Sequence, residues 1–126
     1  MTDAAATTVL LWAGVVLVGG LGSVLRFLVD RTVARRVARP FPFGTLAVNI
    51  SGAALVGFLF GQLSRDAALL ADTAFVGAYT TFSTWMLETQ RLGEERQTWA
   101  AFANIVVSVL LGTAAAYLGQ WIAEQI

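Results

Sequence analysis

Four long apolar segments constrain what this chain can fold into more than any other feature. They run from about Val9 to Val29, from Phe43 to Leu63, from about Leu69 to Leu87 and from Trp99 to Trp121. A helix crosses the hydrocarbon core of a bilayer in about 20 apolar residues. Because 57% of the 126 residues are hydrophobic and 13% are charged, a soluble domain of this length could not bury the apolar surface. The sequence therefore predicts an all-α membrane protein with one four-helix domain over residues 1–126.

The first apolar segment is predicted to be a membrane span and not a signal peptide. The residues before it carry no basic side chain, and its apolar run is longer than the core of a signal peptide. The chain also has no cysteine and no histidine, which excludes thiol and imidazole catalysis and the common zinc, haem and iron–sulfur sites. We therefore do not expect an enzyme.

The arginines predict how the four spans are oriented. All eight cations are arginine, and four of them crowd the first connection while two lie in the third. Those two connections share one side of the membrane, and the second connection on the other side has Arg65 alone. The positive-inside rule then places both termini outside the cytoplasm. The run from Arg31 to Arg39 is better interpreted as a solvated face touching anionic lipid than as a nucleic-acid site.

Small and polar residues recur every four positions in three spans and so share helix faces. The stripes are Gly14, Val18, Gly22 and Arg26; then Thr45, Asn49, Ala53, Gly57 and Gly61; and last Asn104, Ser108, Gly112, Ala116 and Gln120. Close packing of helices in lipid explains most of the glycines. For Asn49 and Asn104, interhelical hydrogen bonding and the lining of a polar path both stay open, and Arg26 either serves such a path or extends to the interface.

The segment Gly77–Glu88 gathers hydroxyl groups inside the third span, as GAYTTFSTWMLE. Glycine, β-branched and aromatic residues lower helix propensity, and hydroxyls compete for backbone hydrogen bonds, so a break is predicted between Gly77 and Thr81. Carbonyls freed at membrane depth are natural ligands for a hard cation such as sodium. Phe82 and Trp85 could present positive ring edges to an anion, with hydroxyls and an Asn amide as donors, although packing is the commoner role of such rings.

At these motifs the chain resembles the Fluc family of bacterial fluoride channels, also called CrcB, over nearly its whole length. The matching segments are GGLGSVLRF at 19–27, PFGTLAVNISGAALVGFLFG at 42–61 and GAYTTFSTWMLE at 77–88. The resemblance implies four helices per subunit, a third helix broken near its middle, and an antiparallel dimer that conducts fluoride passively out of the cytoplasm across the plasma membrane. It also implies a structural sodium ion held by the backbone carbonyls of Gly77 and Thr80 from both subunits.

The resemblance assigns anion-binding or pore-lining roles to eight residues of this chain. These are Asn49, Phe82, Trp85, Thr45, Ser83, Thr84, Ser108 and Arg26, with Glu88 as the carboxylate that closes the third-span motif. Asn49 would donate to the anion, the two rings would present their edges, and the hydroxyls would form a track. Arg26 would lie at a vestibule mouth.

Two departures from the family pattern matter here. The family usually has Phe where this chain has Trp85, and Gly where it has Ala78, so the indole would add an N–H donor to the pore. The arginine bias, in contrast with two-way inserting subunits, favours pairing with a separately encoded subunit of opposite topology over a homodimer. A non-conducting partner subunit and a small proton-coupled exporter are the alternatives. The exporter would need a carboxylate between Val9 and Val29, where this chain has none.

Overall fold

The computed structural model describes residues 2–126, and all of their regular structure is helical. The long helices are α1 (Thr2–Val37), α2 (Phe43–Leu59), α5 (Phe82–Glu94) and α6 (Thr98–Gln125). Three short segments, α3 (Arg65–Ala68), the π-helical η1 (Leu69–Val76) and α4 (Gly77–Tyr79), follow one another without interruption between α2 and α5. Together with α5 they form the predicted third span, which confirms the all-α fold with a broken third helix.

The lengths of the helices fit a bilayer. At about 1.5 Å per residue, the 36 residues of α1 and the 28 of α6 extend for about 54 and 42 Å. These two helices are long and apolar enough to cross a membrane by themselves, and the apolar helix α2 has 17 residues. The second span was predicted to reach Leu63, but α2 ends at Leu59 because the chain turns at Gly61, whose φ of 73° suits glycine.

Small residues bring α2 and α6 together. A Cβ atom on Gly57 would collide with the carbonyl of Ala116, and one on Gly119 would collide with the carbonyl of Ala54. Helix α1 packs on η1 in the same way, since a Cβ on Gly22 would meet the carbonyl of Phe75. The predicted packing stripes are therefore confirmed at Gly22, Gly57 and Ala116.

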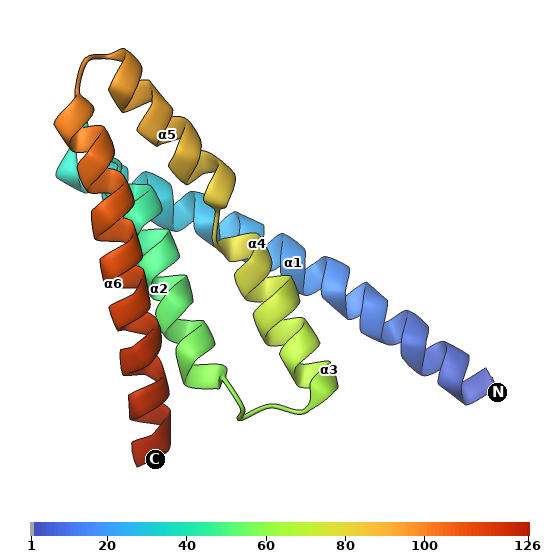
Figure 1. Cartoon of the computed structure of the whole chain (residues 1–126). Coiled ribbons are helices and arrows are strands. Elements are labelled where there is room, and N and C mark those ends of the chain that lie inside the picture. The colour runs from blue at the N-terminus through green and yellow to red at the C-terminus, as the bar shows by residue number, and fades with distance from the viewer. Residues whose placement is uncertain (1) are drawn as a thin grey trace.

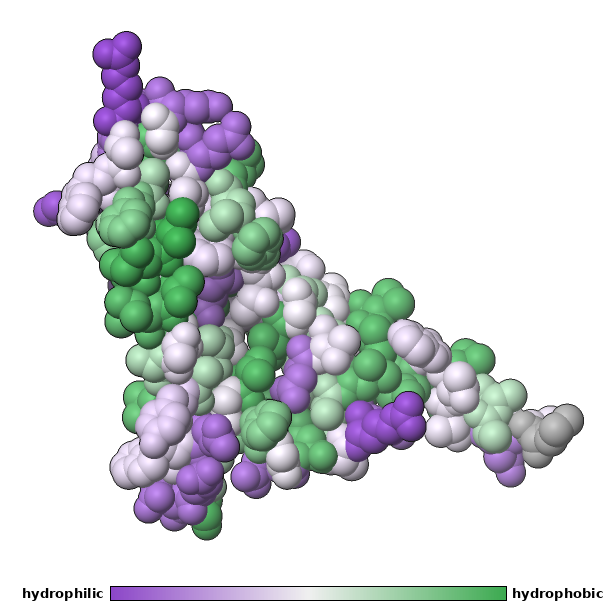
Figure 2. Space-filling model, viewed as in Figure 1, coloured by the Kyte–Doolittle hydropathy of each residue, from purple (hydrophilic) through white to green (hydrophobic). Residues whose placement is uncertain are grey.

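Most of the apolar surface faces outward. Only 6% of the residues in the most apolar windows of α1 and α6 are buried, and the first turns of α1 extend away from the other helices (Figure 1). In the space-filling view, hydrophobic side chains cover the middle of the molecule, while hydrophilic ones gather toward its ends (Figure 2). Lipid, or lipid together with another subunit, is the surrounding that such a surface requires.

The two ends of the molecule differ in what they contain. Both termini and the connection between α2 and α3 lie toward one end, and the α1–α2 and α5–α6 connections lie at the other (Figure 1). Arg39 and Arg96 belong to these latter connections, and Arg31, Arg35 and Arg36 occupy the last turns of α1 beside them. The fold thus gathers at one end the arginines on which the topology prediction depends.

Candidate functional site

The break in the third span lies at Thr80 and Thr81. Helix α4 ends at Tyr79, and the next two residues are extended, with φ and ψ of −80° and 161° at Thr80 and −146° and 121° at Thr81. Helix α5 then begins at Phe82, and Thr81 caps it by accepting a hydrogen bond from the Thr84 N–H on its side-chain oxygen at 3.1 Å. The predicted break is confirmed, and a hydroxyl group stabilises the new helix start.

Asn49 ties this break to α2. Its side-chain amide donates to the Thr81 carbonyl at 2.9 Å, and its side-chain oxygen accepts from the Thr81 N–H at 2.8 Å. Two residues further along α2, Ser51 shares a hydrogen bond of 2.8 Å with the Tyr79 hydroxyl. Asn49 therefore satisfies both backbone groups of an extended residue that has no helical partners. Interhelical bonding is one of the two roles left open for Asn49, and its role as a donor to an anion stays a prediction.

The break releases two carbonyl oxygens from their helical donors. In a continuous helix Gly77 would accept from the Thr81 N–H, but that group donates to Asn49. Thr80 would likewise accept from the Thr84 N–H, which donates to the Thr81 side chain. These are the two carbonyls that the resemblance assigns to sodium, and oxygen ligands of this kind fit a hard cation.

The two aromatic side chains that follow the break form one unit. The rings of Phe82 and Trp85 pack edge to face, with centroids 5.7 Å apart and an angle of 81° between their planes. Phe82 is 71% exposed, whereas the Trp85 indole N–H donates to the backbone carbonyl of Asn104 on α6 at 3.1 Å. The expectation that this N–H serves as a donor inside the pore is therefore wrong, because α6 already uses it.

Two hydrogen bonds between α5 and α6 and one within α5 form a closed ring. The Trp85 indole donates to the Asn104 carbonyl, the Asn104 side-chain amide donates to Thr89 Oγ1 at 2.9 Å, and the Thr89 hydroxyl donates to the Trp85 carbonyl at 2.8 Å. Asn104 is 1% exposed. Of the two roles left open for Asn104, interhelical bonding is the one that the structure shows.

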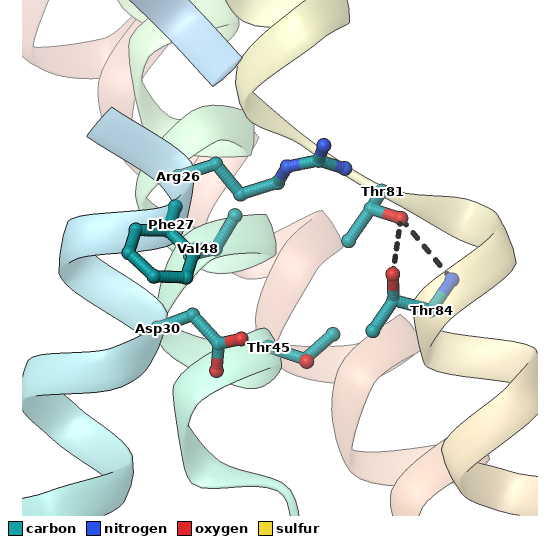
Figure 3. A pocket seen from close by; sticks show the side chains of 7 residues that line it. All are labelled: Arg26, Phe27, Asp30, Thr45, Val48, Thr81 and Thr84. Atoms are coloured by element: carbon teal, nitrogen blue, oxygen red, sulfur yellow. Dashed lines mark hydrogen bonds between the residues drawn. The ribbon is translucent and has the colours of Figure 1, made fainter. Parts of the chain in front are cut away.

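Arg26 lies over a cavity of about 200 Å³ between α1, α2 and the break (Figure 3). Its guanidinium group reaches across the cavity toward Thr81, not along α1 toward the arginine-rich end. The cavity is also lined by Phe27, Asp30, Thr45, Val48, Thr81 and Thr84. On the α5 side the Thr45 hydroxyl donates to the Glu88 carboxylate, so the carboxylate that closes the motif has a polar partner.

The predicted site residues thus fall into two groups. Arg26, Thr45 and Thr84 line the cavity, Thr45 also donates to Glu88 on α5, and Asn49 binds the break. Phe82 and Trp85 lie together and Trp85 contacts α6, on which Ser108 follows Asn104 by one turn. Ser83 is exposed, with its Oγ 3.4 Å from Thr81 Oγ1.

Two residues of this region were not predicted as site residues. Thr81 is the residue that Asn49 holds, and Asp30 lines the Arg26 cavity and lies against Gly44, where a Cβ atom would collide with it. Asp30 follows Arg26 by four positions and so shares its helix face, a spacing that could have pointed to it. The role of Thr81 depends on the exact residue at which the helix breaks, which hydroxyl content alone does not specify.

The fold and this region together define a multi-pass helical membrane protein whose polar groups converge on a broken helix. The sequence model of the family described as "CrcB-like protein, Camphor Resistance (CrcB)" matches residues 13–120, and the chain belongs to this family. It is 74% identical over 125 residues to a Mycobacterium tuberculosis protein named "Fluoride-specific ion channel FluC 2", covering 98% of this chain and 99% of the relative.

More distant relatives match over most of the chain as well. A Syntrophotalea carbinolica protein named "Fluoride-specific ion channel FluC" is 43% identical over 114 residues, covering 86% of this chain and 93% of the relative. A Yersinia pestis protein named "Fluoride-specific ion channel FluC 3" is 36% identical over 124 residues, covering 90% and 94%. The residues that form the break, the cavity and the α5–α6 contact all lie within residues 13–120, which the family model matches.

Proposed function

We propose that this chain is a subunit of a fluoride-selective channel that lets cytoplasmic fluoride leave the cell passively. The observation that carries the proposal is the extended Thr80–Thr81 segment, which Asn49 holds within an apolar fold and which leads directly into the Phe82–Trp85 ring pair. Family membership and the printed names of relatives, one of them 74% identical over 125 residues, support the same function.

The chemistry of the region suits a small anion that binds hydrogen-bond donors strongly. Hydroxyl and amide donors and the positive edges of aromatic rings can replace the water around fluoride without a fixed positive charge that would trap it. Hydrogen fluoride enters cells as a neutral weak acid and ionises in the more alkaline cytoplasm. An inside-negative membrane potential then drives fluoride outward through a selective pore, by about 2.3 kcal/mol per charge for each 100 mV.

Sodium is the cation that we assign to the break, as a structural ion. The released carbonyls of Gly77 and Thr80 support this assignment, because each has lost its helical donor to a side chain. A bound cation would supply the positive charge that fixes two such breaks against each other in a dimer. Preparation and assay in sodium-free N-methylglucamine buffer should lower fluoride flux, and readdition of sodium should restore it.

The assembly that we propose is an antiparallel dimer in the bacterial plasma membrane. The outward-facing apolar surface of α1 supports a need for further cover, and the six arginines against one support a single orientation with both termini outside. The partner is then a separately encoded subunit of opposite topology. The relatives' names carry the numbers 1, 2 and 3, as expected where one organism encodes several such chains.

The deciding test replaces Phe82 with isoleucine in proteoliposomes that contain this chain together with a subunit of the opposite charge bias, and follows fluoride with an electrode while potassium and an ionophore clamp the voltage. Phe82 is 71% exposed, so F82I should fold normally yet lose most of the fluoride efflux. The matched control is F60I, because Phe60 is 67% exposed at the end of α2, away from the break. If F82I leaves fluoride efflux at the wild-type level, the result would instead support the alternative that this chain is a non-conducting partner subunit.

A further inference from the structure

The hydroxyl of Ser108 is buried without a hydrogen-bond partner among the described residues, unlike those of Ser23, Thr80 and Thr89. Serine and threonine in a helix usually donate to the carbonyl four residues earlier. Ser23 does so to Gly19 at 3.2 Å, Thr80 to Val76 at 2.9 Å and Thr89 to Trp85 at 2.8 Å. Ser108 Oγ is buried and has no hydrogen-bond partner within residues 2–126. A buried polar atom of this kind calls for a specific explanation.

The acceptor that Ser108 would ordinarily use is the carbonyl of Asn104. A carbonyl oxygen has two lone pairs. Within α6 one of them faces the N–H of Ser108, four residues later, and the other accepts the Trp85 indole N–H at 3.1 Å. Trp85 therefore occupies the position that the Ser108 hydroxyl would take.

Trp85 is held in this position by several contacts. The ring of hydrogen bonds through Thr89 and Asn104 joins its backbone and its indole to α6, and Phe82 packs against its ring. A phenylalanine at this position would fill similar space but has no N–H. The Asn104 carbonyl would then be open to the hydroxyl of Ser108.

We propose that Trp85 is a positioning residue that keeps the Ser108 hydroxyl proton free to donate to a small anion, by occupying the Asn104 carbonyl. The anion is fluoride if the proposed function is right, and the inference rests on that function. Because Ser108 Oγ is buried, an ion that reaches it must be small and must leave its water behind. A free O–H at that point replaces part of the lost hydration.

The test removes the indole N–H while keeping the shape of the ring. Benzothienylalanine at position 85 has a sulfur atom where tryptophan has N–H. In proteoliposomes that also contain a subunit of the opposite charge bias, S108A in the otherwise wild-type chain should lower fluoride efflux about fivefold, the effect of losing one hydrogen bond. With benzothienylalanine at 85, efflux should already be about fivefold lower, and adding S108A should change it little. Equal losses from S108A in both backgrounds would overturn the proposal.

The control is S23A, because the Ser23 hydroxyl already donates to Gly19 and lies on α1. It should leave efflux at the wild-type level.

A separate measurement follows the indole N–H of Trp85 by ultraviolet resonance Raman spectroscopy in a chain whose Trp12, Trp99 and Trp121 are replaced by phenylalanine. We expect the spectrum to show a hydrogen-bonded indole N–H, and we expect S108A to leave that signal unchanged. A free N–H would overturn the inference alone, whereas no fluoride flux in any assembly would overturn the proposed function and the ligand together.

Discussion

At the scale of single residues, Asn49 is the side chain whose loss should cost most. Replacing it with alanine removes two hydrogen bonds to Thr81 and leaves an extended residue unsatisfied, so we expect N49A to destabilise the chain by about 2 kcal/mol. N49D should be worse for efflux, because a carboxylate would face the Thr81 carbonyl that the amide now reaches. Thermal unfolding in detergent and fluoride efflux measure the two effects, and N49D with wild-type efflux would contradict this role.

The sequence predicted much at this scale, but not the partners of side chains. Five hydroxyl-bearing residues between Tyr79 and Thr84, around a poor helix core, were enough to locate the break, because helix propensity is local. The bond between Trp85 and Asn104 joins residues 19 positions apart, and it depends on how α5 and α6 pack. No local pattern contains that information, so the indole N–H was wrongly placed in the pore.

At the scale of helices, two glycines of α6 should respond in opposite ways to alanine. A Cβ on Gly119 would collide with the carbonyl of Ala54 on α2, so G119A should separate the two helices and cost about 1–3 kcal/mol. Gly112 has no atom within 4 Å of the same position, and G112A should be neutral or should stabilise α6 by up to about 1 kcal/mol. Unfolding of the two variants in detergent gives the comparison, and equal destabilisation would mean that α2 and α6 pack differently.

The four-residue stripes predicted some helix contacts and missed others. Gly57 meets Ala116, as the stripes suggest, but Gly119 lies outside the predicted stripe and is one of the closest contacts in the chain. Periodicity identifies a face of one helix. The rotation of that face toward a neighbour depends on the complete set of packed helices.

At the scale of the whole molecule, the arginines should decide both the orientation of the chain in the membrane and whether it can conduct fluoride without a partner subunit. The connections at one end have six arginines and the connection at the other has one, so the C-terminus should lie outside the cytoplasm. A reporter fused there should show alkaline phosphatase activity and no green fluorescent protein signal. Two chains inserted in the same direction cannot form an antiparallel pair. We therefore expect the chain alone to give little fluoride efflux and a subunit of the opposite bias to restore it.

Moving arginines from one end of the molecule to the other should change both its orientation in the membrane and its fluoride efflux without a partner. Replacing Arg35 and Arg36 with glutamine and introducing Q62R and D66R leaves four arginines against three, so the chain should insert in both directions. Such a chain could pair with itself, and its efflux without a partner should rise above that of the wild type. R35Q and R36Q with Q62N and D66N is the control, because its four arginines still face one. Full efflux from the wild-type chain alone, with its termini on one side only, would show that the pair is not antiparallel.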